Sequence, residues 1–188
     1  MPRNLVIGID PGAGGAIAVY DLEQQRLVQA DALPTVALPR NGKKRTALDG
    51  YALADVLWRL EARVKLLVCE DVHAHPKQGL ASTFSFGLTT GIIQGIVAAY
   101  QIPAHFCSPA TWKKALGISS DKDLCRRKAT TLFPYAADYW RRRSQHDEAE
   151  AALLAWYGAR FVLGEGSEMG RGTVDDAQRL LKETAPNG

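Results

Sequence analysis

The chain has 188 residues, a length that fits one domain with a core of its own. Apolar residues make up 46% of it and charged residues 23%, as in an ordinary soluble globular protein. The N-terminal apolar run is too short for a signal peptide, and no stretch approaches the roughly 18 apolar residues of a membrane span. The three cysteines match neither a zinc nor a disulfide pattern, so we expect a reducing, cytoplasmic location and no membrane partner.

Positive charge is concentrated in one part of the chain. The net charge is +3, yet between Lys113 and Arg143 nine Lys or Arg face only three Asp, a local charge of +6. Such a basic stretch suits a polyanionic partner. An exposed helix face followed by a charged loop explains it equally well.

The first part of the chain predicts a β-hairpin. Residues 5–10 are typical of a buried strand, a Gly-rich turn follows, and residues 16–20 and 27–33 predict two more strands. Residues 34–46 contain two prolines and the basic residues Arg40, Lys43, Lys44 and Arg45, so we expect a loop there. Apolar periodicity then predicts a helix over 49–64.

The remaining elements alternate between strand and helix. We expect strands at 65–69 and 104–107, and helices at 84–100, 108–117, 121–132 and 144–162. Pro109 suits a first helical position, and Ser144 suits an N-cap with Asp147 completing a capping box. This order predicts a mixed α/β sheet with helices on its faces, formed by residues 1–163. Residues 164–188 read as a Gly-rich linker and a short C-terminal helix.

Four carboxylates occupy an unusual context. Asp10 and Glu70 each end an apolar strand, while Asp147 and Glu150 lie one helical turn apart on one face. An all-oxygen set of this kind suits Mg²⁺, and two such ions can activate a water and stabilise the leaving oxygen of a phosphodiester. Each acid also has a structural explanation, as a turn residue, a solvated strand end or a partner of the helix dipole. The joint pattern favours a metal site.

Five motifs in order resemble the RuvC-like Holliday junction resolvases, particularly their phage and plastid branch. They are residues 7–12 (IGIDPG) with 15–18 (GAIA), 68–70 (VCE), 82–87 (STFSFG) with Gly91 and Gly95, 108–117 with 121–122, and 146–151 (HDEAEA). The resemblance runs from about residue 5 to residue 158. The resemblance implies a ribonuclease H-like fold, a homodimer, and paired symmetric nicks in a four-way DNA junction, with 5′-phosphate ends.

The same resemblance assigns roles to individual residues. Asp10, Glu70 and Asp147 fall on metal-binding catalytic positions, and Glu150 falls on a fourth that is usually Asp in the bacterial proteins. We expect two Mg²⁺ ions per site, with Mn²⁺ as a substitute. Lys122 matches a lysine near the scissile phosphate, and the other expected DNA-backbone contacts are Lys113, Lys114, Arg141, Arg142 and Arg143. His146 is either a supporting acid or base or an exposed residue at a helix start.

Some features depart from the family or stay open. Many relatives have an aromatic residue shortly after the strand-ending Glu, where this chain has His73 and His75. Gly87, Gly91 and Gly95 form a flat helical stripe that packs against either the sheet or a second protomer. Phe84 and Phe86 are more typical of a core or an interface than of base stacking.

Three alternative functions remain at this stage. One is another nuclease of the same fold, integrase-like or directed at RNA–DNA hybrids, which the motifs at 82–87 and 112–114 disfavour. A second is a nucleotide-binding protein of the actin and sugar-kinase type, which needs two such domains and a longer chain. A third is a junction-binding protein without catalysis, against which the complete carboxylate set argues.

Overall fold

A mixed five-stranded sheet forms the centre of the computed structural model, which describes residues 2–12, 14–40, 43–71, 79–119 and 121–164. Its strand order is β3-β2-β1-β6-β7. Strands β1 (Leu5–Asp10), β2 (Ala16–Asp21) and β3 (Arg26–Ala32) pair antiparallel, whereas β6 (Val64–Glu70) and β7 (Ala104–Cys107) continue the sheet in parallel with β1. The predicted mixed sheet, an antiparallel hairpin followed by parallel strands, is therefore confirmed.

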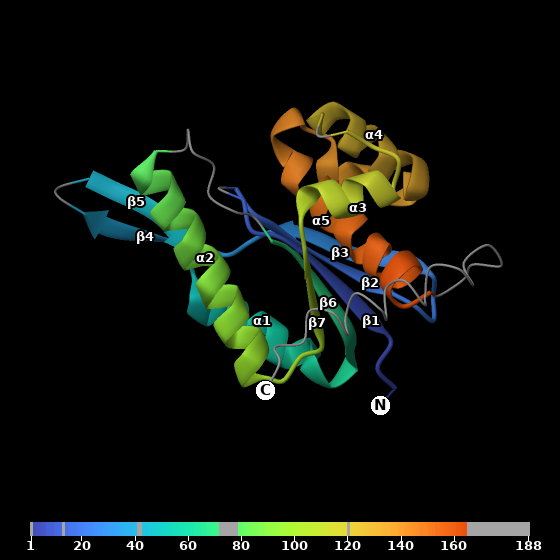
Figure 1. Cartoon of the computed structure of the whole chain (residues 1–188), viewed down its shortest axis with the longest axis horizontal. Helices are drawn as coiled ribbons and strands as arrows, with labels where there is room; N and C mark the ends of the chain where they lie inside the picture. The colour runs from blue at the N-terminus through green and yellow to red at the C-terminus, as the bar shows by residue number, and fades with distance from the viewer. Residues whose placement is uncertain (1, 13, 41–42, 72–78, 120, 165–188) are drawn as a thin grey trace.

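Helices cover both faces of this sheet, as Figure 1 shows. One face carries α1 (Gly50–Leu60) and α2 (Leu80–Ala99), and the other carries α3 (Pro109–Ala115), α4 (Lys122–Leu132) and α5 (His146–Tyr157). Short helical segments complete the chain at η1 (Glu61–Arg63), η2 (Pro134–Trp140), η3 (Arg143–Gln145) and η4 (Gly158–Val162). Alternating residues of β1 serve the two faces, because Val6 belongs to the core under α5 whereas Ile7 and Ile9 belong to the core under α1 and α2.

Local sequence explains where several helices begin. The Ser108 side chain accepts a hydrogen bond from the Thr111 N–H, and Pro109 occupies the first turn of α3, as predicted. Asp49 and Asp121 cap α1 and α4 in the same way. The expected cap at Ser144 is wrong, because Ser144 lies inside η3 and α5 begins only at His146. Just before α5, the Gln145 side-chain oxygen accepts a hydrogen bond from the Arg142 backbone N–H instead.

The basic segment expected to be a loop forms a second, two-stranded sheet. Strand β4 (Thr35–Arg40) pairs antiparallel with β5 (Lys43–Leu48), in a register that sets Arg40 opposite Lys43. The intervening sequence Asn41-Gly42, a strong signal for a tight hairpin, explains why pairing prevails over the prolines. Figure 1 shows this hairpin extending away from the main sheet beside the start of α2.

Small residues let α5 approach β1 closely. A Cβ added at Gly8 would lie 2.1 Å from the Ala151 carbonyl oxygen and 2.5 Å from the Ala155 amide nitrogen. Four alanines of α5 are buried, and the helix contacts β1 and β2. This close fit brings the first turns of α5 to the edge of the sheet where β1 ends.

Helix α2 leaves one apolar face uncovered. Leu80, Phe84 and Leu88 follow one another every four residues and are 91%, 63% and 47% exposed. A Cβ added at Gly87, Gly91 or Gly95 would meet nothing within 4 Å, so the glycine stripe does not pack on the sheet. Contrary to expectation, α2 is long and apolar enough to cross a membrane by length and composition alone, because its polar residues are uncharged.

Two sequence predictions lie outside the described residues. The positions of His73 and His75 fall in one undescribed segment. The linker and helix expected within residues 164–188 fall almost wholly in another, so the proposed division into two regions stays a prediction.

Candidate active site

The topology brings Asp10 and Glu70 to one edge of the sheet. Both residues end neighbouring parallel strands, and the register pairs Ile9 of β1 with Cys69 of β6. Helix α5 packs across β1 with Asp147 in its first turn and Glu150 one turn later. The carboxyl ends of two strands and the start of one helix thus deliver the four acids that the sequence singled out.

Asp10 is the most deeply placed of these acids. It is 5% exposed, and its Oδ1 accepts a hydrogen bond of 2.9 Å from the Gly12 N–H. Burial raises the pKa of Asp10 well above its ordinary value, and the negative charges of Asp147, Glu70 and Glu150 raise it further, against the opposing Gly12 bond. The three other carboxylates therefore disfavour the charged form of Asp10.

Glu70 is held by an indole that the sequence analysis did not assign to the site. The Nε1–H of Trp112, a fully buried residue of α3, donates to Glu70 Oε1 at 3.1 Å. Burial raises the pKa of Glu70 above its ordinary value, although the Trp112 bond and the positive charge of Lys113 oppose that shift. No local pattern indicates this contact, since it joins residues that are 42 positions apart.

Glu150 is paired with the next residue of α3. Lys113 Nζ lies 3.2 and 3.3 Å from the two Glu150 oxygens, and both side chains are largely buried. Desolvation lowers the pKa of Lys113, but the Glu150 carboxylate outweighs it, so that pKa lies above its ordinary value. Lys113, expected as a DNA contact, therefore balances a site carboxylate in this structure.

Asp147 lies against the glycine turn that follows β1. A Cβ at Gly14 would lie 2.6 Å from Asp147 Oδ2, so a side chain at this position would displace the Asp147 carboxylate. His146 Nε2 is 2.7 Å from Asp147 Oδ1 and also contacts the Lys122 ammonium, while its Nδ1 is 3.2 Å from the Arg143 carbonyl oxygen. A protonated ring can donate to Asp147, whereas a neutral ring with its proton on Nδ1 accepts from Lys122.

The donor set fits a hard divalent cation. Four carboxylates supply only oxygen, and a cation would relieve the repulsion that raises the pKa of Asp10. Within the described part of the chain, no group of three or more Asp, Glu, His or Cys side chains is arranged as a ready metal cage. From α3, Trp112 donates a hydrogen bond to Glu70 and Lys113 donates one to Glu150.

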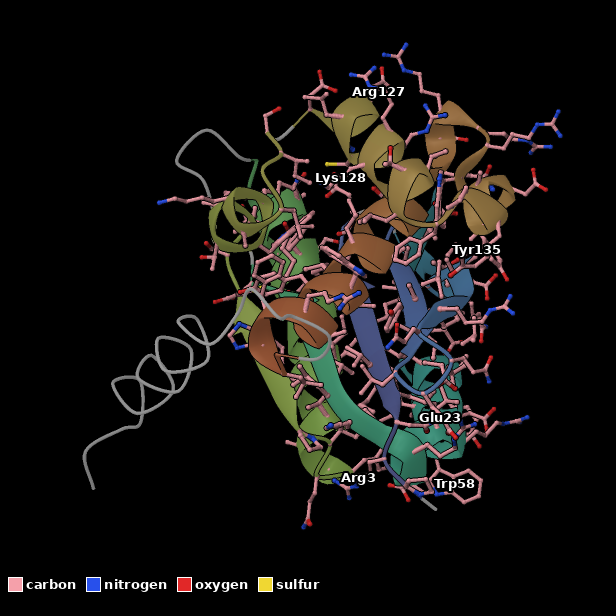
Figure 2. All side chains as sticks on the ribbon, turned by 90° about the vertical axis from the view of Figure 1, so that its right-hand side faces the viewer. Arg3, Glu23, Trp58, Arg127, Lys128 and Tyr135 are labelled. Atoms are coloured by element: carbon pink, nitrogen blue, oxygen red, sulfur yellow. The ribbon has the colours of Figure 1, made fainter. Side chains whose placement is uncertain are left out.

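The other predicted basic residues lie at the surface around the site. Lys114 is exposed on α3, and Lys122 is the exposed first residue of α4. Arg141, Arg142 and Arg143 are exposed just before α5, and Arg143 pairs with Asp123 at 3.1 Å. Arg126 instead braces the chain, donating to the backbone carbonyls of Trp140 and Arg141. Figure 2 shows Arg127 and Lys128 at one end of the molecule, opposite Arg3 and Trp58.

Comparison with solved structures identifies the fold. RuvC of T. thermophilus in complex with a Holliday junction substrate matches with a TM-score of 0.60 and 17% identity, over 82% of this chain and 94% of that one. The chain has the RuvC fold. A second Thermus thermophilus RuvC structure gives a TM-score of 0.54 and 18% identity, over 86% of this chain and 97% of that one.

A eukaryotic structure shares the same architecture. The yeast mitochondrial Holliday junction resolvase Ydc2 matches with a TM-score of 0.53 and 14% identity, over 98% of this chain and 85% of that one. No protein-family model and no curated protein matches the sequence. The RuvC fold thus confirms the ribonuclease H-like architecture expected from the motifs.

Proposed function

We propose that this chain is a Mg²⁺-dependent endonuclease that resolves four-way DNA junctions by paired, symmetric nicks. The observation that carries the proposal is the placement of Asp10 and Glu70 at the ends of neighbouring parallel strands of a RuvC fold, with Asp147 and Glu150 on the helix that packs across β1. One of the matched structures is a RuvC bound to a Holliday junction substrate, and another is a mitochondrial Holliday junction resolvase. A shared fold with an intact acidic set favours the same substrate class.

Each site residue has a defined task under this proposal. Asp10, Glu70, Asp147 and Glu150 would hold two Mg²⁺ ions, or Mn²⁺ in their place. Bound divalent ions lower the pKa of water and stabilise charge on a leaving phosphate oxygen. Trp112 fixes the orientation of Glu70, and Lys113 offsets the charge of Glu150. His146 Nε2 contacts both Asp147 and Lys122.

Exposed cations around the site would bind the DNA backbone. Lys114, Lys122, Arg141, Arg142 and Arg143 are exposed on α3, α4 and the segment before α5. Contacts of this kind position a duplex without reading its sequence. Lys113 joins them if a metal ion takes over its role beside Glu150.

The uncovered face of α2 supports the proposed homodimer. Leu80, Phe84 and Leu88 present an apolar stripe, and the three glycines beside it permit a close approach. No charged residue occurs between Leu80 and Ala99. Because a junction has two-fold symmetry, two nicks at opposite strands suit an enzyme of two-fold symmetry.

A substrate panel tests this function. The full chain is incubated with a labelled four-way junction, a linear duplex of the same sequence and an RNA–DNA hybrid, with Mg²⁺ or with EDTA. We expect symmetric nicks in the junction alone, and only with Mg²⁺. Preference for the hybrid would favour another ribonuclease H-like nuclease, and junction binding without cleavage would favour a non-catalytic binding protein.

A further inference from the structure

The β4–β5 hairpin carries a charge that the proposed active site does not use. Four cations, Arg40, Lys43, Lys44 and Arg45, stand on residues 35–48, where the sequence has no acidic residue. The segment therefore carries +4 in a chain whose total is +3. All four cations belong to the end of the hairpin farthest from the main sheet, since the register pairs Arg40 with Lys43 and Leu38 with Arg45.

The hairpin is an arm rather than part of the core. In the described part of the chain its two strands pair with each other and not with the main sheet, and residues 35–39 are exposed. Val36 and Leu38 are 36% and 46% exposed, so the strand does not bury its apolar residues against the domain. Among the described residues, the arm is held by the Asp49 N–H, which donates to the Pro34 carbonyl at its base, and by contacts between β5 and α2.

The base of this arm adjoins the candidate active site. The Leu33 N–H, just before β4, donates to the Gly15 carbonyl at 2.9 Å. A Cβ added at Gly15 would lie 2.6 Å from Leu33 Cδ1 and 3.2 Å from the Asp10 carbonyl oxygen. The arm therefore begins beside the turn that follows Asp10.

The length of the arm sets where its charge lies. Six extended residues at about 3.3 Å each place Arg40 roughly 20 Å from the base. That reach corresponds to about six base pairs of duplex at roughly 3.4 Å per pair. If the hairpin follows a DNA arm that leaves the candidate site, the cations near its tip would meet the backbone of that arm.

We propose that the β4–β5 hairpin is a DNA-binding arm that contacts the phosphate backbone of a junction arm about six base pairs from the cleavage site. This inference rests on the proposed function and adds the element that holds the duplex beyond the active site. Charge complementarity selects DNA as the occupant. A second copy of the chain fits less well, because two tips of like charge would repel one another across a two-fold axis.

The test neutralises the tip in the full chain, with Asp10→Asn present to prevent cleavage. The variant Arg40→Gln, Lys43→Gln, Lys44→Gln, Arg45→Gln is compared with a charge-preserving variant that exchanges Arg and Lys at the same four positions. A remote control is Arg3→Gln with Arg59→Gln. Arg3 precedes β1 and lies at the end of the molecule opposite Arg127 (Figure 2), and Arg59 lies near the end of α1. Junction affinity is measured against salt concentration, and hydroxyl-radical footprints locate the protected stretches of the DNA sugar backbone.

We expect neutralisation to weaken junction binding about 10- to 100-fold near 0.1 M salt and to reduce the slope of log K against log salt by about 2 to 4. Protection about six base pairs from the crossover should disappear, and the charge-preserving variant should keep both properties. A slope equal to that of the remote control, or a change only in sedimentation of the free protein, would overturn the inference while leaving the proposed function standing. If the chain with an unsubstituted hairpin tip binds a junction no better than a linear duplex, the proposed function fails. The salt dependence of binding to the linear duplex then still decides whether the arm contacts DNA.

Discussion

Burial of Asp10 in the candidate site makes the stability of the fold depend on pH. Its folded-state pKa is raised, so the folded chain holds that proton more tightly than the unfolded chain. The contribution of Asp10 to stability is therefore most favourable below its unfolded pKa of about 3.9 and is lost as pH rises through its folded pKa. Without divalent cations, burying this charge at neutral pH destabilises the fold.

Asp10→Asn should accordingly raise the melting temperature at pH 7.5 in EDTA, and the advantage should vanish near pH 4. Each kcal/mol of stability corresponds to about 2–4 °C for a chain of this size. Thermal unfolding of both proteins across pH measures the difference. A gap that does not change with pH would show that the charge of Asp10 is not the cause.

Trp112 should act through Glu70 rather than on substrate. Trp112→Phe leaves a buried carboxylate oxygen without its donor, and we expect about 1–3 kcal/mol of lost stability and about 10-fold weaker Mg²⁺ binding. Trp140→Phe is the matched control, because Trp140 is equally buried and its Nε1–H donates to Thr130 Oγ1 at 2.9 Å, away from the acids. Calorimetric titration with Mg²⁺ distinguishes them. Equal Mg²⁺ affinities in the two variants would show that Trp112 does not support metal binding through Glu70.

At the scale of secondary-structure elements, the packing of α5 on β1 positions Asp147 and Glu150. Gly8→Ala should push α5 away from the sheet, because the new methyl group meets backbone atoms that cannot move independently. We expect a loss of about 1–3 kcal/mol or more, with weaker Mg²⁺ binding as Asp147 and Glu150 shift. Gly79→Ala, where an added Cβ meets nothing within 4 Å, should lose less than about 1 kcal/mol. Chemical denaturation measures both, and similar losses would contradict the packing argument.

The apolar face of α2 should join two protomers. Phe84→Glu places a charge in the middle of that face, so the 20.5 kDa chain should sediment as a monomer and make single rather than paired nicks. Trp58→Glu is the control, because Trp58 is a 60% exposed aromatic residue on α1. Sedimentation velocity checks the assembly. A wild-type monomer with junction bound would refute the dimer, and partition of the chain into vesicles would favour a membrane as the partner of α2.

Much of the whole molecule could be predicted from sequence because its signals are local. Apolar runs that stop at Asp10 and Glu70 mark strand ends, and the three-residue spacing of Asp147 and Glu150 places both on one helical face. The prolines led to the wrong prediction of a loop at β4, because an edge strand tolerates a proline such as Pro39. The contacts of Trp112 and Lys113 with the acids, and the fit of Gly8 under α5, depend on how distant elements pack. No local pattern encodes such distances.

The central claim is that one Mg²⁺-dependent carboxylate site cuts branched DNA. Mapping of cut positions on a mobile four-way junction, with wild type and Asp10→Asn side by side, tests it most directly. We predict paired nicks at symmetric positions with 5′-phosphate ends for wild type, no nicks in EDTA, and intact junction binding without cleavage for Asp10→Asn. Normal cleavage by Asp10→Asn, or cuts by wild type that ignore the branch point, would contradict the account.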